Sequence, residues 1–190
     1  MSLLTKDNIV SSAIEKMLRG LAFWIGYCKV MNELYEHDCV HQAYAILRAN
    51  LGRERYAIEY EFKYSVIYPS IDTQERADLV ILKKTKKQNR PVCVMEFKMS
   101  DNTNGGVDAD VEKLHKIKNK SIPKFIILLF DKDNPSLVRR FTEVKKNSLR
   151  AKRMKDSNVR VRRVAKAMAT ADNPKRNPYM AVCIEVLDVS

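Results

Sequence analysis

The sequence predicts a mixed α/β fold in which helices cover the faces of one sheet. Three observations lead to this prediction. Segments with helical spacing of apolar residues fill the first quarter of the chain, three strand-like segments follow, and a further helix precedes a short, wholly apolar strand. A helical crossover before a strand without wet positions is typical of a sheet buried on both faces. With 190 residues and 45% hydrophobic content, the chain fits a single domain.

The first half of the chain supplies the helices and the first three strands. Residues 8–52 carry apolar side chains at helical spacing, and we expect Gly20 and Gly26 to divide this segment, with its last helix running from about Glu33 to Leu51. Residues 57–68 alternate between apolar and polar side chains, which indicates a strand with one wet face. Residues 76–82 and 91–100 are expected to form a hairpin across the charged connection 83–90.

The second half alternates between helices and strands. Residues 108–120 begin with aspartates that suit a helix N-terminus, and residues 124–130 form the short apolar strand. Asn134 and Pro135 fit the start of a helix that continues to residue 154, inside a basic helical region. Residues 179–189 are expected to form a closing strand. We therefore divide the domain into a core over about 33–130, a basic segment over about 134–176 and the closing strand.

Several classes of protein are disfavoured. No apolar run of 18 residues and no secretory layout occur, so we expect a cytoplasmic protein with no membrane contact. The four cysteines are far apart and form no C-x-x-C, so we interpret them as core residues rather than zinc ligands or disulfides. The chain has no glycine-rich phosphate loop, which argues against a nucleoside-triphosphate enzyme.

The net charge of +12 is concentrated in one part of the chain. From Arg139 to Arg176 there are 14 Lys and Arg against 3 Asp and Glu, while the rest of the chain carries 21 against 20. A concentrated basic surface favours a phosphate polyanion as partner, and a solvated lysine-rich helix face is the alternative.

The hairpin brings charged residues into an apolar strand. If residues 83–90 form the connection, a symmetric register opposes three pairs of residues on one face of the sheet: Leu82 with Val92, Val80 with Val94, and Asp78 with Glu96. Directly opposed Cβ atoms lie about 5 Å apart, so this register places two carboxylates together. Lys98 shares their face because it lies two residues beyond Glu96.

Two neighbouring carboxylates in an apolar setting need a cation. Lys98 is one candidate. Bound Mg²⁺ is the other, because this ion takes one or two carboxylates and leaves positions for water and a substrate phosphate. Lys98 could then orient an attacking water, or deprotonate it if burial lowers the pKa of the lysine. The alternative is a surface strand on which Glu96 and Lys98 are solvated.

An aspartate on one strand followed by Glu-x-Lys on the next, here Asp78 with 96-EFK-98, resembles the PD-(D/E)XK nuclease superfamily. The resemblance implies a restriction-endonuclease-like mixed sheet with an α-β-β-β-α-β core. It also implies that Asp78 and Glu96 bind Mg²⁺, together with the main-chain carbonyl of Phe97, and that Lys98 is catalytic. Ala77 departs from the pattern, because the family name specifies proline at that position.

The flanking segments extend the resemblance over residues 33–130. Family members often carry an acidic metal ligand on the helix before the first strand. Glu36 is similar to that residue, with Glu33 as its substitute and His41 as a candidate for a catalytic part. The segment 110-DVEKL-114 resembles the helix that follows the third strand in many members.

These features lead us to expect a Mg²⁺-dependent deoxyribonuclease, with Mn²⁺ able to substitute. It would be an endonuclease of the restriction or defence type or the cleavage subunit of a larger assembly, and double-strand cleavage would need a homodimer or a partner subunit. The residues expected to grip the DNA backbone are Arg150, Lys152, Arg153, Arg160, Arg162 and Arg163. A non-catalytic nucleic-acid-binding module and an RNA-cleaving enzyme are the alternatives.

Overall fold

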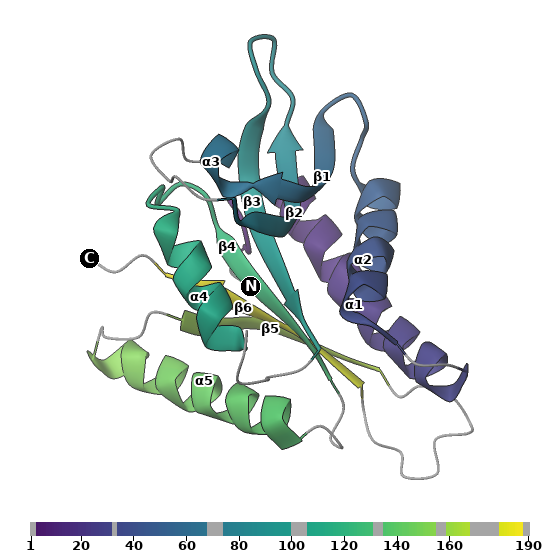
Figure 1. Cartoon of the computed structure of the whole chain (residues 1–190), viewed down its shortest axis with the longest axis vertical. Helices are drawn as coiled ribbons and strands as arrows, with labels where there is room; N and C mark the ends of the chain where they lie inside the picture. Colours follow the sequence, from purple (N-terminus) through teal and green to yellow (C-terminus); the bar gives the residue numbers. More distant parts are fainter. Residues whose placement is uncertain are drawn as a thin grey trace.

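The computed structural model describes residues 3–31, 34–67, 74–99, 106–130, 135–154, 159–167 and 179–187. Its elements are, in chain order, α1 (Asn8–Met31), α2 (Glu36–Asn50), β1 (Tyr56–Lys63), α3 (Tyr64–Ile67), β2 (Arg76–Lys83), β3 (Arg90–Lys98), α4 (Val107–Lys116), β4 (Lys124–Phe130), α5 (Pro135–Met154), β5 (Val159–Ala167) and β6 (Tyr179–Val186). Figure 1 shows these elements, which confirm the predicted mixed α/β class.

A single mixed sheet forms the centre of the molecule. Six strands lie in the order β1-β2-β3-β4-β6-β5, and β3 and β4 are parallel while every other neighbouring pair is antiparallel. The parallel pair needs a crossover, and α4 supplies it. All seven residues of β4 are buried, as its apolar run predicted.

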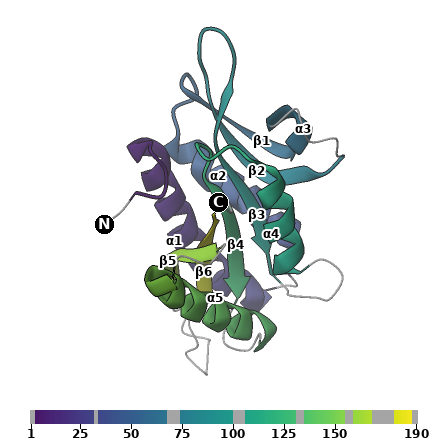
Figure 2. The same cartoon turned by 90° about the vertical axis from the view of Figure 1, so that its left-hand side faces the viewer.

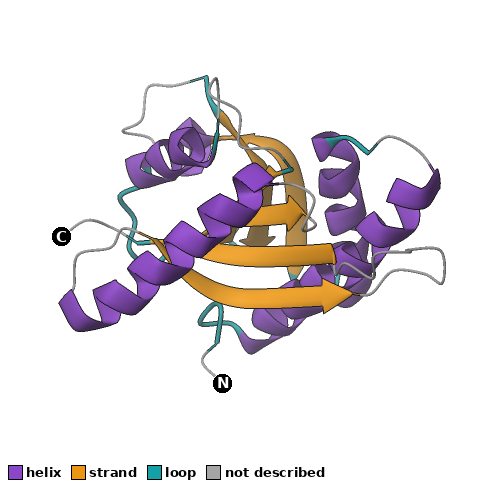
Figure 3. Cartoon of the chain, turned by 90° about the horizontal axis from the view of Figure 1, so that it is seen from below, coloured by secondary structure: helices purple, strands orange, loops and turns teal. Residues whose placement is uncertain are grey.

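Helices cover both faces of the sheet, as Figures 1 and 3 show. Apolar side chains of α1 and α2, such as Ile14 and Ala43, form one core with one face of the sheet. Leu114 of α4 and Leu137 of α5 belong to a second core on the other face. The β2–β3 hairpin projects beyond the helices at the top of Figure 2.

The prediction that Gly20 and Gly26 divide the first segment was wrong. Helix α1 runs through both glycines to Met31, and α2 begins at Glu36. A Cβ atom on Gly20 would lie 2.7 Å from Cδ1 of Ile46 on α2. The glycine therefore permits close approach of the two helices, which a single sequence does not distinguish from a helix break.

The strand observed in the segment 57–68 is shorter than the alternating pattern predicted. Strand β1 ends at Lys63, and Tyr64–Ile67 form the short helix α3, in which Tyr64 and Ile67 are buried. Glu61 has a positive φ of 45°, which bends the end of β1. Val66 extends the apolar alternation of the sequence but is 62% exposed in α3, so the residue types alone hide the change from strand to helix.

Among its described residues, the basic region is helical only over α5. Helix α5 ends at Met154, and Val159–Ala167 form strand β5, which pairs with β6 at the edge of the sheet. Val159 and Val161 pack against the α4–α5 side of the core. The prediction that this stretch is helical was therefore wrong, because the alternating valines provide the strand signal among the arginines.

Two expectations about composition can be compared with the fold. Among the described residues, no helix is both long and apolar enough to cross a membrane. All four cysteines are free; Cys39, Cys93 and Cys183 are buried in the core as expected, whereas Cys28 is half-buried.

Candidate active site

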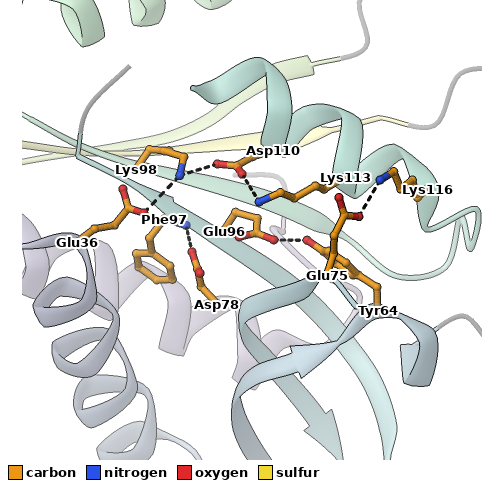
Figure 4. A network of polar contacts seen from close by, with 10 residues as sticks. All are labelled: Glu36, Tyr64, Glu75, Asp78, Glu96, Phe97, Lys98, Asp110, Lys113 and Lys116. Atoms are coloured by element: carbon orange, nitrogen blue, oxygen red, sulfur yellow. Dashed lines mark hydrogen bonds and ion pairs between the residues drawn. The ribbon is translucent and has the colours of Figure 1, made fainter. Parts of the chain in front are cut away.

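The predicted catalytic residues lie together where β2, β3 and three helices meet (Figure 4). Glu36 begins α2, Asp78 lies on β2, and Glu96, Phe97 and Lys98 end β3. Helices α3 and α4 add residues from the opposite face of the sheet. The site is therefore assembled from segments that are far apart in the sequence.

The hairpin register agrees with the prediction near the site but not at the other end. Val80 pairs with Val94 as expected, and Leu79 pairs with Met95. A bulge between Ile81 and Leu82 shifts the pairing, so that Leu82 opposes Pro91 and the expected pairing with Val92 is wrong. The bulge lies toward the turn and leaves the carboxylate end in register.

Asp78 is fixed to the neighbouring strand just beyond the last pair. Its Oδ2 accepts a hydrogen bond of 2.7 Å from the main-chain N–H of Phe97. Burial raises the pKa of Asp78, and the hydrogen bond from Phe97 N–H and the neighbouring Glu96 carboxyl group partly offset the rise. The two carboxyl groups therefore lie close enough to influence each other's ionisation.

Glu96 is more buried than Asp78, with 2% of its surface exposed. The hydroxyl of Tyr64 donates a hydrogen bond to Glu96 Oε1. Burial and then the charge of Asp78 raise the pKa of Glu96 well above 4.5, although the hydrogen bond from Tyr64 opposes the rise. In the absence of a cation the two carboxyl groups therefore resist being ionised together.

Glu36 connects the start of α2 to the end of β3. Its Oε1 lies 3.3 Å from Nζ of Lys98, and its Oε2 accepts a hydrogen bond of 3.2 Å from the N–H of Met99. The structure thus brings the predicted helical acid to the site. The substitute, Glu33, lies outside the described residues.

Asp110 on α4 is a site residue whose position the sequence only suggested. It is 1% exposed, its Oδ2 lies 3.2 Å from Nζ of Lys98, and its Oδ1 accepts a hydrogen bond of 3.0 Å from Nζ of Lys113. The available signal was the acidic opening of 110-DVEKL-114. Tyr64 is the second site residue that the sequence did not predict, because its strand-like context gave no sign of a contact with Glu96.

Lys98 lies between two acidic side chains, one from each helical layer. Burial lowers the pKa of Lys98, but the charges of Asp110 and Glu36 outweigh it and raise the pKa above 10.5. This direction opposes the condition under which Lys98 was expected to deprotonate water. In this arrangement Lys98 is an ammonium group suited to donating hydrogen bonds.

Mg²⁺ prefers oxygen ligands, and the candidate site offers several carboxyl groups. Among the described residues, no group of three or more His, Cys, Asp or Glu side chains is arranged to hold a metal ion. The neighbouring carboxyl groups of Asp78 and Glu96 nevertheless provide the two hard oxygen ligands that Mg²⁺ often takes from a protein. The site contains four carboxyl groups and only two lysines, so a bound cation would offset its negative charge. These residues are Glu36, Asp78, Glu96, Asp110, Lys98 and Lys113.

A pocket of about 570 Å³ opens beside Asp78. It lies between the first turns of α2 and the end of β1. Glu36 and Asp78 form part of its lining, and the remaining lining residues are Tyr35, His37, Val40, His41, Tyr60 and Glu61. His41, the candidate for a catalytic part, lines this pocket and contacts the ring of Tyr60.

The predicted nucleic-acid contacts fall into two groups. Arg160 and Arg162 on β5 pair with Glu185 at 2.5 and 2.9 Å, and Arg163 pairs with Glu15 at 2.8 Å. These arginines therefore have acidic partners within the protein. Arg150, Lys152 and Arg153 belong to the last turns of α5, and their side chains lie outside the described part of the structure.

A second basic surface lies at the turn end of the hairpin, beside the charged connection 83–90. A groove of about 820 Å³ is lined by Lys6, Arg55, Lys83 and Arg90, with Asp7 as its acidic residue. Lys83 lies 3.2 Å from Asp7, and the other three basic residues are exposed. Residues from three segments thus form a cationic surface that only folding brings together.

Comparisons with protein-family models, with curated proteins and with solved structures gave no match to this chain.

Proposed function

We propose that the chain is a divalent-metal-dependent nuclease of the PD-(D/E)XK type. The observation that carries the proposal is the placement of Asp78, hydrogen-bonded to Phe97 N–H, next to Glu96 on the neighbouring strand, with Lys98 between Glu36 and Asp110. This is the grouping that the resemblance of 78-D and 96-EFK implies. A purely structural cluster has less need of two neighbouring carboxyl groups whose pKa values are both raised, chiefly by burial.

The order of elements supports the same proposal. Helix α2, strands β1 to β3, helix α4 and strand β4 follow one another as the α-β-β-β-α-β core of a restriction-endonuclease-like fold does, with α3 as a short addition. Strands β6 and β5 extend the sheet beyond β4. The candidate site lies within this core.

Each residue then has a chemical part. Asp78 and Glu96 would hold Mg²⁺, with the main-chain carbonyl of Phe97 and the Glu36 carboxylate as the further ligands that the resemblance implies. Bound Mg²⁺ supplies Lewis-acid stabilisation of charge on a scissile phosphate. Lys98, held as an ammonium group, donates hydrogen bonds to a phosphate oxygen or to the attacking water. Tyr64 fixes the Glu96 carboxyl group.

DNA is the proposed substrate, and RNA is the alternative. The cationic groove of Lys6, Arg55, Lys83 and Arg90 offers contacts for a phosphate backbone at the other end of the hairpin. Glu96 and Arg90 are separated by six residues of one strand, which corresponds to about 20 Å. A bound strand could therefore reach both surfaces. A second copy of the chain or a partner subunit remains the proposed route to cutting both strands of a duplex.

The proposal is tested by incubating the purified chain with plasmid, single-stranded DNA and RNA in Mg²⁺, in Mn²⁺ and in EDTA. We expect cleavage that requires the metal. The near-isosteric variants D78N and E96Q and the variant K98M should each lose at least about 100-fold in rate, since each removes charge stabilisation at the reacting phosphate.

Glu112→Gln is the matched control, because Glu112 is an exposed carboxylate on α4 outside the site. It should cleave at the rate of the unchanged protein, and thermal melting should show that all variants are folded. Equal cleavage by D78N, E96Q and the unchanged chain would refute the assignment. Metal-independent binding without any cleavage would favour the non-catalytic module.

A further inference from the structure

Five aromatic rings form a continuous row along α2 and β1. The ring centroids of Tyr35 and His37 are 5.8 Å apart, those of His37 and His41 are 6.2 Å apart, and those of His41 and Tyr60 are 5.3 Å apart. Tyr44 then stacks on Tyr60 at 4.5 Å with an interplanar angle of 25°. Such rows are more usual inside a core, whereas Tyr35 is 56% exposed and Tyr60 is 37% exposed.

Four of these rings line the pocket that opens beside Asp78. Tyr35, His37, His41 and Tyr60 border the same space of about 570 Å³ as Glu36 and Asp78. This volume lies within the usual range for sites that bind small organic groups. The aromatic surface is therefore placed directly against the carboxylates of the candidate active site.

The pocket is also where the backbone is strained. Glu61, which lines it, has a φ of 45°, an uncommon conformation for a residue with a side chain. Strain of this kind persists only where the surrounding structure holds it, and it occurs often at binding sites. Here it turns the chain immediately after Tyr60.

The chemistry of the lining selects the kind of ligand. Glu36, Glu61 and Asp78 give the pocket an acidic character, so a phosphate alone has no favourable partner there. A flat, uncharged aromatic group is suited to the exposed faces of Tyr and His rings, and nucleobases stack on such rings with little dependence on sequence. A base inside a duplex has both faces covered, so only an unpaired base can enter.

We propose that this pocket binds an unpaired nucleobase, and that the preferred ligand is therefore single-stranded nucleic acid. The inference rests on the proposed nuclease function for one part only, namely that the phosphate next to the bound base lies at Asp78. Base stacking itself requires neither the metal nor cleavage. The two ideas can therefore fail separately.

The test uses single-stranded and duplex oligonucleotides that contain 2-aminopurine, a fluorescent base whose emission falls when it stacks. They are titrated with the full chain in EDTA, so that metal-dependent cleavage does not interfere. We expect quenching and tighter binding with the single strand. The variants Y60A and Y35A should each bind it at least about 5-fold more weakly, in line with the loss of one stacking contact.

Two further variants, together with Y35A, make the result interpretable. Tyr60→Phe keeps the ring and should bind as the unchanged chain does. Tyr27→Ala removes a tyrosine of similar exposure, 53%, that lies on α1 outside the pocket, and it should change nothing. Tyr35 precedes α2 and is more exposed than Tyr60, so Y35A keeps the test valid even if Y60A fails to fold.

Each outcome separates the two proposals. Unchanged single-strand binding by Y35A and by a folded Y60A, or equal binding and quenching with the duplex, would overturn the pocket inference even if Asp78-dependent cleavage occurs. Ring-dependent stacking combined with cleavage that survives D78N and E96Q would leave the pocket in place and remove the proposed nuclease site.

Discussion

At the scale of single residues, the decisive feature is a pair of carboxyl groups that are costly to ionise together. Glu96 is buried beside Asp78, and the pKa of each is raised, first by burial. Tyr64 and Lys113 lower the pKa of Glu96 only in part. Ionising both carboxyl groups therefore destabilises the metal-free protein, and an added cation would offset this effect.

This cost predicts a pH dependence of stability. Both pKa values are higher in the folded protein than in the unfolded chain, so the folded state binds more protons between the two sets of values. Their contribution is fully present below pH 4 or so, near the unfolded-chain values, and is lost as pH rises through the raised values. In EDTA, urea unfolding should show falling stability from pH 5 to 8, by about 1.4 kcal/mol for each unit of pKa shift.

Glu96→Gln should remove most of this slope, because it deletes one charge and keeps an oxygen that accepts from Tyr64. The variant should be more stable than the unchanged chain at pH 8 in EDTA. Glu112→Gln, an exposed control, should follow the unchanged curve. A slope that is identical in E96Q and in the unchanged chain would show that the carboxyl pair is not its source.

At the scale of elements, the contact between α1 and α2 positions Glu36, because α2 begins at that residue. Gly20 brings the two helices together against Ile46. Helix α1 also has a firm start: Asp7 Oδ1 accepts hydrogen bonds from the N–H groups of Ile9 and Val10 at 3.1 and 3.4 Å. The first helix therefore acts as a rigid support for the second.

A double-mutant cycle at this contact tests the reason for the glycine. Ala is favoured over Gly in a helix by about 1 kcal/mol, but in the unchanged chain its Cβ would meet Cδ1 of Ile46 at 2.7 Å. Ile46→Val removes that atom. We expect G20A to be at least about 0.5 kcal/mol more favourable in the I46V background than alone, as measured by urea unfolding. Strict additivity would show that close approach does not explain the glycine.

Several elements could be predicted and others could not, for identifiable reasons. The apolar run at 124–130 was unambiguous, because a fully buried strand has no wet positions. Residues 64–67 were misassigned because Val66 continues the apolar alternation of β1, although Val66 is exposed and Ile67 is buried in the structure. Strand β5 was misassigned because its arginines dominated the composition, although Val159 and Val161 carried the strand signal.

At the scale of the whole molecule, charge counted along the chain and charge placed in space differ. The chain from Arg139 to Arg176 holds nearly all the excess, yet its described arginines on β5 pair with Glu185 and Glu15. The groove at the hairpin turn instead collects basic residues from three segments, of which only the hairpin connection 83–90 is strongly basic. Phosphate contacts depend on the second arrangement, since counterion release follows local surface charge.

Salt titration of DNA binding tests this reversal with two matched double variants. R55Q/R90Q removes two exposed arginines of the groove and should reduce the log–log salt slope by about 1 to 2, at roughly 0.9 per phosphate contact. R160Q/R163Q removes the same charge from β5 and should change the slope less, because these arginines already have acidic partners. The opposite order would restore β5 as the main phosphate contact.

The sequence by itself determined the class of fold, the hairpin and the chemical identity of the candidate site. Period-two alternation and the position of the connection were enough to place Asp78 and Glu96 on neighbouring strands, because hydrogen-bonded register is a local property. Tertiary structure alone decided what surrounds them. Asp110, Tyr64 and the aromatic row reach the site from segments whose relative placement depends on core packing, and no local pattern encodes that placement. The same packing puts Lys98 between two acids, which set its charge.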